Sequence, residues 1–103
     1  MSALHRWAGL LLMLAAPASA PAETHTVLID GMQFRPATLV VRRGDTVVWH
    51  NQDLVPHTVT VVGGFDSGHI DPGGQWRWTV GGEGRIDYVC TYHPGMKGAL
   101  TLR

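Results

Sequence analysis

Turn-forming residues recur at roughly 8–12-residue intervals from position 23 onward, and this spacing constrains the fold more than any other feature. Between the turns lie short runs rich in β-branched and aromatic residues, at 25–29, 37–41, 46–50, 57–62, 75–80, 85–90 and 98–102. No stretch of helical length shows the apolar period of a helix without a Gly or Pro interrupting it. The sequence therefore predicts one all-β domain of seven or eight short strands, arranged as a sandwich or barrel.

Composition excludes several classes of protein. Eight basic and eight acidic side chains leave no net charge, so the chain lacks the basic excess with which a nucleic-acid-binding protein neutralises phosphates. An apolar content of 45% is too high for a disordered tail. Cys90 is the only cysteine, which excludes an intrachain disulfide framework and any four-cysteine zinc or iron–sulfur site.

The N-terminal segment has the pattern of a secretory signal peptide. A weakly positive start is followed by an apolar run at 7–16 and then by small residues up to Ala22. The apolar run is too short for a membrane anchor, because crossing the hydrocarbon core takes about 20 residues. We therefore expect residues 1–22 to be removed on export to the periplasm or beyond, leaving a domain at 23–103 with no stable membrane insertion.

Three cleavage positions compete within this segment. Cleavage after Ala20 would place the rigid Pro21 next to the cut bond, where a peptidase accommodates it poorly. Cleavage after Ala22 is therefore favoured, and cleavage after Ala18 is the second choice.

Strand alternation predicts where two reactive side chains point. Over 57–62, a period of two aligns His57 with two valines and leaves Thr58 on the other face. Over 85–90, the same period aligns Cys90 with Ile86 and Tyr88. We expect His57 to begin one strand and Cys90 to end another, both at the rim of the sandwich and turned toward its interior.

The chemistry is concentrated in Cys90-Thr-Tyr-His93-Pro-Gly-Met96, where a thiol, an imidazole and a thioether follow one another at intervals of three. A turn at Pro94–Gly95 would bring Met96 back toward the other two, and His57 would join them from its strand. Among metals, this donor set favours copper, because thiolate and thioether bind Cu(I) while imidazole binds both oxidation states. A structural zinc site has no use for a thioether.

Each of these residues also has an ordinary explanation when taken alone. Cys90 can be a small buried hydrophobe, Met96 a core residue and His93 a solvated loop residue. Cysteine and histidine can also form a nucleophilic pair. Against catalysis, Cys90 does not precede a helix whose N-terminus would activate the thiol, and no further acid stands nearby in sequence to orient a base.

Taken together, these motifs resemble those of the cupredoxins, the small blue (type 1) copper proteins. The two-residue gaps in the ligand loop resemble the short loop of amicyanins, whereas plastocyanins and pseudoazurins have a longer gap between His and Met. The resemblance covers nearly all of the domain and rests on Met32-Gln-Phe34-Arg-Pro36, Arg43-Gly44-Asp45-Thr-Val-Val-Trp49-His-Asn51, Val55-Pro56-His57-Thr, Asp71-Pro72-Gly73 and Tyr88-Val-Cys90-Thr-Tyr-His93-Pro-Gly-Met96-Lys-Gly98.

The resemblance implies an eight-stranded Greek-key β-sandwich with one copper ion at one end. It assigns His57, Cys90 and His93 as equatorial ligands and Met96 as the axial ligand. It also implies that Asn51, with Thr91 as its partner, ties the two ligand-bearing loops together next to the copper thiolate.

Two positions in the ligand loop depart from the amicyanin pattern. Tyr92 stands where that loop has proline, and Gly95 replaces a bulkier residue before the methionine. Both changes alter the surface beside His93, so the redox partner of the amicyanins is not carried over.

The function that the resemblance implies is one-electron transfer between redox proteins (a dehydrogenase, cytochrome or oxidase as donor or acceptor), without enzymatic turnover, by a monomer. His57 would be buried, and the ring edge of His93 would reach the surface as the electron port. An apolar collar for brief docking would surround it, formed by Leu54, Val55, Pro56, Pro94 and Gly95.

The competing interpretation is a periplasmic copper carrier or buffer that uses the same ligands. Electron transfer is favoured, because carriers bind copper through flexible Met- or His-rich segments, whereas only Met32 and Met96 remain once residues 1–22 are removed.

Overall fold

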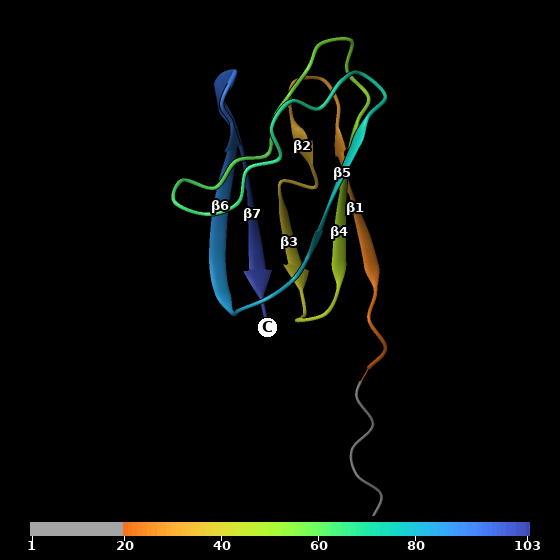
Figure 1. Cartoon of the computed structure of the whole chain (residues 1–103), viewed down its shortest axis with the longest axis vertical. Coiled ribbons are helices and arrows are strands. Elements are labelled where there is room, and N and C mark those ends of the chain that lie inside the picture. The colour runs from red at the N-terminus through yellow and green to blue at the C-terminus, as the bar shows by residue number, and fades with distance from the viewer. Residues whose placement is uncertain (1–19) are drawn as a thin grey trace, which may run out of the picture.

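A computed structural model of the chain describes residues 20–103, which form two packed β-sheets (Figure 1). Most of the predicted signal peptide falls on residues 1–19, outside the described residues. Among the residues described, no helix is long and apolar enough to cross a membrane. The strands are β1 (Thr24–Ile29), β2 (Phe34–Arg35), β3 (Thr38–Val41), β4 (Thr46–Asn51), β5 (Gln75–Thr79), β6 (Gly84–Cys90) and β7 (His93–Leu102).

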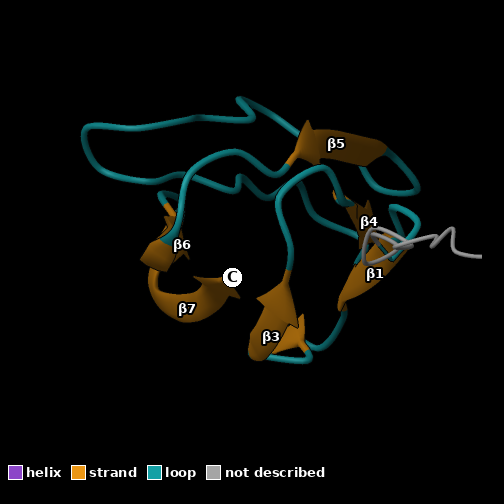
Figure 2. Cartoon of the chain, turned by 90° about the horizontal axis from the view of Figure 1, so that it is seen from below, coloured by secondary structure: helices purple, strands orange, loops and turns teal. Residues whose placement is uncertain are grey.

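The two sheets have the orders β2-β1-β4-β5 and β3-β7-β6, and Figure 2 shows them as two facing layers. Strand β1 runs parallel to β4 and strand β3 runs parallel to β7, whereas the β4–β5 and β6–β7 pairs are antiparallel. The chain thus changes sheet between β2 and β3, and again between β3 and β4. The predicted all-β sandwich is confirmed, with seven strands in the described part of the chain instead of eight.

The strand expected over 57–62 does not form, whereas the short strand β2 was not among the predicted runs. Residues 57–62 belong to the long connection 52–74 between β4 and β5, which leaves the first sheet and crosses to the second (Figure 1). Along this path the backbone pairs only through isolated bridges, of His57 with Ile70 and of Thr60 with Asp66 and Val89. Because its partners change every few residues, the segment cannot build a continuous ladder despite its β-branched composition.

The core lies between the sheets and is centred on Trp49 of β4 and Tyr88 of β6, both almost completely buried. Their rings meet edge to face at a centroid distance of 5.5 Å, and Phe34 packs against Tyr88 at 4.8 Å. The predicted alternation of β6 is confirmed, since Tyr88 and Cys90 are buried, Asp87 is exposed and Val89 is only half-buried. Cys90 is therefore the end of a core-facing row.

Tyr88 packs directly on Gly98, its partner on β7, and this contact leaves no room for a side chain. A Cβ at position 98 would lie inside the van der Waals radius of the Tyr88 ring. We expect Gly98→Ala to lower the free energy of unfolding by about 1–3 kcal/mol, the usual cost of overpacking. Urea unfolding of the metal-free protein measures this change.

Gly81→Ala is the matched control, since a Cβ there would meet nothing within 4 Å. Equal urea midpoints for the two variants would show that the Tyr88–Gly98 contact is not tight.

Asp45 closes the end of the sandwich at which β1 begins. Its buried carboxylate accepts the N–H groups of Glu23 at 3.0 Å and Arg42 at 2.9 Å, and it lies 2.8 Å from Nε2 of His25. The Glu23 N–H, the His25 ring and the Arg42 N–H stabilise the charged form more than burial disfavours it, and they lower the pKa of Asp45 from 3.8 to about 2.

This lowered pKa makes the contribution of Asp45 depend on pH. Stabilisation by a carboxylate whose pKa is lowered on folding is complete above its unfolded value and is lost as the pH falls through its folded value. We expect Asp45→Asn to be less stable than the wild type at neutral pH, with the difference shrinking as the pH falls from about 4 to 2.

Urea midpoints measured across this range test the expectation, and Asp87→Asn on β6 controls for the loss of one carboxyl group. A difference that stays constant down to pH 2 would contradict it.

Candidate metal centre

Three potential metal ligands come from two distant parts of the chain. His57 lies on the 52–74 connection, whereas Cys90 ends β6 and His93 begins β7. The reversal between the two strands is at Thr91–Tyr92, next to an irregularity in pairing at Val89/Cys90. The turn expected at Pro94–Gly95 is therefore wrong, since those residues continue β7. The two-residue reversal brings His93 directly opposite Cys90.

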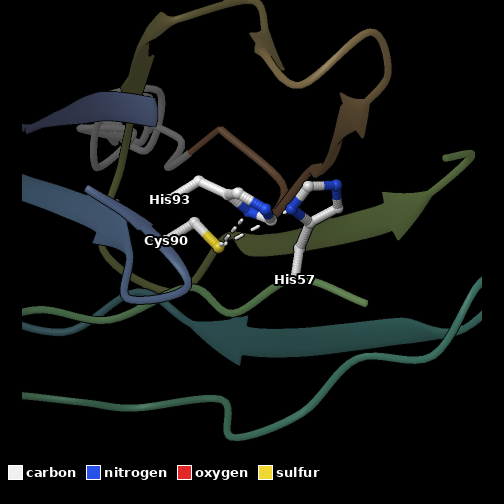
Figure 3. A group of neighbouring side chains, drawn as sticks. All are labelled: His57, Cys90 and His93. Atoms are coloured by element: carbon white, nitrogen blue, oxygen red, sulfur yellow. Dashed lines mark hydrogen bonds between the residues drawn. The ribbon is translucent and has the colours of Figure 1, made fainter. Parts of the chain in front are cut away.

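The cysteine sulfur faces both imidazoles, and the three side chains form a triangle (Figure 3). Sγ of Cys90 is 3.6 Å from Nδ1 of His57 and 3.7 Å from Nδ1 of His93, and the ring centroids are 5.2 Å apart. All three donor atoms lie within 4.8 Å of one another. Cys90 and His57 are fully buried, as predicted, and His93 is half-buried. A cysteine sulfur and two imidazole nitrogens that converge at a protected rim are a donor set for a thiophilic metal ion.

The backbone of the 52–74 connection contributes directly to the sulfur site. The N–H of Thr58 points at Sγ of Cys90 at 3.3 Å, an interaction that stabilises a thiolate. The Thr58 hydroxyl accepts the N–H of Thr91 at 2.9 Å and lies 3.1 Å from the Thr91 hydroxyl. Thr58 thus joins the histidine-bearing connection to the cysteine-bearing turn.

Asn51 has partners different from those expected. Its amide group donates to the carbonyls of Val55 at 2.9 Å and Ile70 at 3.1 Å, and its side-chain oxygen accepts the N–H of Asp53 at 3.0 Å. Within residues 20–103 it has no hydrogen bond to Thr91. Asn51 therefore shapes the loop that leads to His57, while Thr58 makes the link to the cysteine turn.

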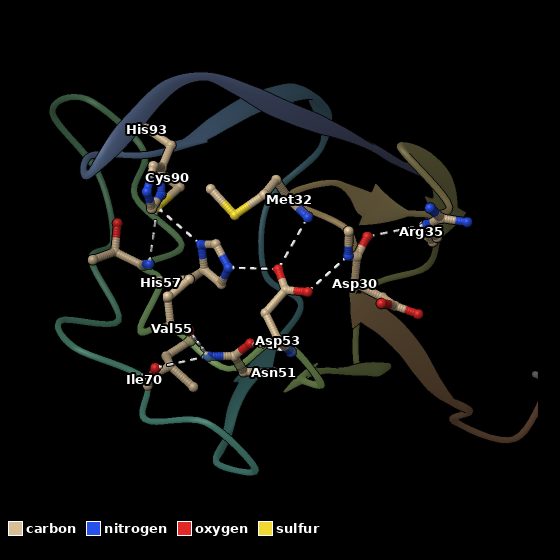
Figure 4. Close-up of polar contacts among 12 residues, drawn as sticks. Asp30, Met32, Arg35, Asn51, Asp53, Val55, His57, Ile70, Cys90 and His93 are labelled. Carbon is tan, nitrogen blue, oxygen red and sulfur yellow. Dashed lines mark hydrogen bonds and ion pairs between the residues drawn. The ribbon is translucent and has the colours of Figure 1, made fainter.

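A carboxylate occupies the far side of the buried histidine (Figure 4). Oδ2 of Asp53 is 2.7 Å from Nε2 of His57, the ring nitrogen that faces away from Cys90. Burial raises the pKa of Asp53, but the Met32 N–H, the His57 ring and the Gly31 N–H outweigh it, so the pKa lies below its usual value.

Two of these residues, Asp53 and Thr58, were not predicted from the sequence. Asp53 stands four residues before His57 in an irregular loop, where no periodicity shows its direction. The regular strand expected over 57–62 would turn the Thr58 side chain to the face opposite His57. The one sequence feature that indicates a role for Thr58 at the site is its position directly after a candidate ligand.

The remaining predicted site residues lie around this cluster. Met96 is buried on β7 in the same apolar core cluster as Cys90. In the predicted docking collar, Leu54 is 93% exposed and Val55 is 42% exposed, so both are available to a partner. Pro94 and Gly95 are also exposed, whereas Pro56 is half-buried.

Tyr92 is an exposed aromatic residue that the predicted collar left out. It precedes His93, and its hydroxyl lies 3.1 Å from Nδ1 of His69 on the 52–74 connection. It therefore adds to the surface on which a partner would meet the ligand turn.

The link between Thr58 and Thr91 makes a specific contribution to stability. Thr58→Val keeps the volume and the N–H that faces Cys90, but it leaves the Thr91 N–H without its acceptor. We expect the metal-free protein to lose about 1 kcal/mol of its free energy of unfolding.

Thr79→Val, at an exposed position on β5, is the control for replacing a hydroxyl by a methyl group. Similar urea midpoints for the two variants would mean that the Thr58 hydroxyl does not hold the turn.

A two-sheet sandwich with one thiol and two imidazoles at one end is the arrangement of a cupredoxin. The family model for the cupredoxin-like domain matches residues 3–102, and the chain belongs to this family.

Its relatives include amicyanins. The chain is 32% identical to the amicyanin of Paracoccus versutus over 93 residues, which cover 84% of this chain and 70% of the relative. It is 28% identical to amicyanin-alpha of Methylorubrum extorquens over 95 residues, which cover 86% of this chain and 80% of the relative.

Solved amicyanin structures have a similar fold. The structure of an oxidised amicyanin variant matches with a TM-score of 0.75 and 30% identity, covering 78% of this chain and 82% of the other. The Cu(I) form of another amicyanin variant matches with a TM-score of 0.74 and 29% identity, covering 84% of this chain and 87% of the other.

Proposed function

We propose that this protein is a periplasmic blue-copper electron-transfer protein, which carries one electron at a time between a donor and an acceptor protein. The observation that carries the proposal is the position of the Cys90 sulfur, 3.6 and 3.7 Å from Nδ1 of His57 and His93. The similarity to amicyanins, one of them solved as a Cu(I) form, supports copper as the metal.

His57, Cys90 and His93 would hold the copper ion as equatorial ligands, with Met96 as the axial ligand. The donor set fits this ion, because thiolate and thioether suit Cu(I) and imidazole suits both oxidation states. When bound, copper supplies the one-electron couple between Cu(I) and Cu(II).

The protein's own residues keep the ligands in place during this change. The N–H of His57 donates to the C=O of Ile70 at 3.2 Å, and the N–H of Ile70 donates to the C=O of His57 at 2.8 Å. The N–H of Thr58 donates to the Cys90 sulfur. Restricting ligand movement lowers the reorganisation that each electron transfer requires.

Location and docking follow from the same proposal. Residues 1–22 act as a signal peptide cleaved after Ala22, with Ala18 as the second choice, and the domain 23–103 works in the periplasm as a monomer without substrate turnover. The half-buried ring of His93 is the electron port. The collar of Leu54, Val55, Pro56, Pro94 and Gly95 forms a small, transient interface with a redox partner such as a dehydrogenase or cytochrome.

The visible spectrum of the purified protein with one equivalent of Cu(II) tests the site. We expect an intense blue band from thiolate-to-copper charge transfer, which bleaches when ascorbate reduces the copper. Cys90→Ser keeps the shape of the side chain but removes the sulfur, and it should give no blue band. A pale complex in the wild type that does not bleach would contradict the electron-transfer function.

The alternative, a copper carrier with the same ligands, differs in what it exchanges. An electron carrier should show fast electron self-exchange between its reduced and oxidised forms and slow release of copper to a chelator. Rapid copper release with slow self-exchange would favour the carrier.

A further inference from the structure

The chain enters the sandwich beside a buried carboxylate. Just before β1, the N–H of Glu23 donates to Oδ1 of Asp45 at 3.0 Å, while the Glu23 carbonyl accepts the N–H of Thr46 at 2.9 Å. Asp45 lies in the connection between β3 and β4 and is only 4% exposed. Glu23 is therefore held on both sides of its Cα, with its nitrogen against a negatively charged group.

The Asp45 carboxylate has no counter-ion with a full, constant charge. Its other donors are the backbone N–H of Arg42 at 2.9 Å and Nε2 of His25 at 2.8 Å. His25 is its only ion-pair partner among residues 20–103, and an imidazole is charged only when it is protonated. A carboxylate withdrawn from water is stabilised best by a cation that also donates a hydrogen bond to it. The nitrogen of Glu23 is the donor that can acquire such a charge.

The residues that precede Glu23 contribute little to the fold. Residues 20–22 are exposed and extend beyond the end of the sandwich (Figure 1). They form no hydrogen bond with the part of the chain that the structure describes. Ala20 and Pro21 only line one side of a cleft of about 260 Å³, which Asp45 also lines. The contacts that hold this end together therefore begin at Glu23.

We propose that cleavage after Ala22 creates an ammonium group at Glu23 that serves as the counter-ion of Asp45, so that processing completes this end of the sandwich. Hydrolysis of the Ala22–Glu23 bond adds the hydroxyl of water to the Ala22 carbonyl carbon and a proton to the Glu23 nitrogen. The amine then takes up a further proton from solvent, because α-amino groups are mostly protonated at neutral pH. The inference rests on the signal peptide of the proposed function but not on copper.

The first test locates the new terminus. The full chain is exported from a bacterial host, and the intact mass of the purified protein identifies its first residue. We expect this residue to be Glu23. A mature protein that begins at another residue would overturn the inference, because position 23 would then carry no free ammonium group.

The second test compares two forms of the metal-free domain, each released from a removable N-terminal tag. One form begins at Glu23. The other begins at Ala22, which keeps the same charges but places the ammonium group one residue farther from Asp45. At about pH 6, we expect the form that begins at Glu23 to have the higher urea midpoint and an equilibrium constant for folding about 3–10-fold larger. Equal midpoints would overturn the inference.

Two substitutions decide whether Asp45 causes this difference. In the Asp45→Asn background, both forms should have the same midpoint, because the carboxylate is gone. Asp87→Asn removes an exposed carboxylate on β6 and should leave the difference unchanged. A difference that survives in Asp45→Asn would refute the ion pair.

The pH dependence of the difference decides the matter if Asp45→Asn does not fold. Pairing with a carboxylate raises the pKa of an ammonium group, so the stabilisation is present below about pH 8 and is lost as the pH rises through the raised value. The other ionisable side chains that line the cleft, those of Glu23, His25 and Arg42, are present in both forms and cancel in the comparison. We expect the two midpoints to converge between about pH 8 and pH 11. A constant difference over this range would contradict the inference.

The outcomes separate this inference from the proposed function. A protein that turns blue with Cu(II) and bleaches on reduction, but begins at another residue, would refute the inference alone. A protein that begins at Glu23 and shows the expected stability difference, but gives no blue band, would refute the electron-transfer function alone.

Discussion

The structure depends on the contact between the 52–74 connection and the end of β6. The backbones of Thr60 and Val89 exchange two hydrogen bonds of 2.9 Å, and next to them Thr58 bonds both the Cys90 sulfur and the Thr91 N–H. These bonds attach a long irregular segment to the opposite sheet. Without them, nothing in the sheet pairing would place a histidine of the connection beside a cysteine 33 residues later in the sequence. The metal centre is therefore a product of how the sandwich is closed at this end.

A second constraint acts on the other side of His57. A buried imidazole beside a sulfur atom can turn its ring or shift its proton, and either change would point the wrong nitrogen at the site. The Asp53 carboxylate removes this freedom, and the β1–β2 turn in turn holds the carboxylate. The N–H groups of Gly31 and Met32 donate to this carboxylate at 2.7 and 3.0 Å, and Met32 adopts a positive φ of 62° there. The strained backbone of Met32 thus belongs to the same assembly as His57. Strain of this kind persists where the surrounding structure determines the conformation.

Sequence reasoning succeeded where the signal was local and periodic. The alternation that buries Tyr88 and Cys90 depends only on the pleat of one strand, and it was predicted correctly. It failed where the path of the chain depends on partners distant in sequence. The β-branched residues of 57–62 look like a strand, yet they have no continuous neighbour to pair with. Pro94–Gly95 resembles a turn, yet the chain already reverses at Thr91–Tyr92, and Pro94 and Gly95 fall in the break in pairing between His93 and Lys97. Asp53 was missed for the same reason, since only the assembled hairpin reveals its partners.

The two imidazoles of the site differ in a way that bears on electron transfer. Both ring nitrogens of His57 are engaged, one toward Cys90 and the other by Asp53, and the ring is fully buried. His93 is half-buried and turns only Nδ1 toward the sulfur; within residues 20–103, its Nε2 has no hydrogen bond. One histidine is thus held on both sides, while the other keeps a free edge close to the exposed Tyr92. Because electron transfer requires close approach with little ligand movement, the anchored ring suits the role of a fixed support. In the proposed function, the free edge of His93 is the point at which a redox partner would approach the copper ion most closely.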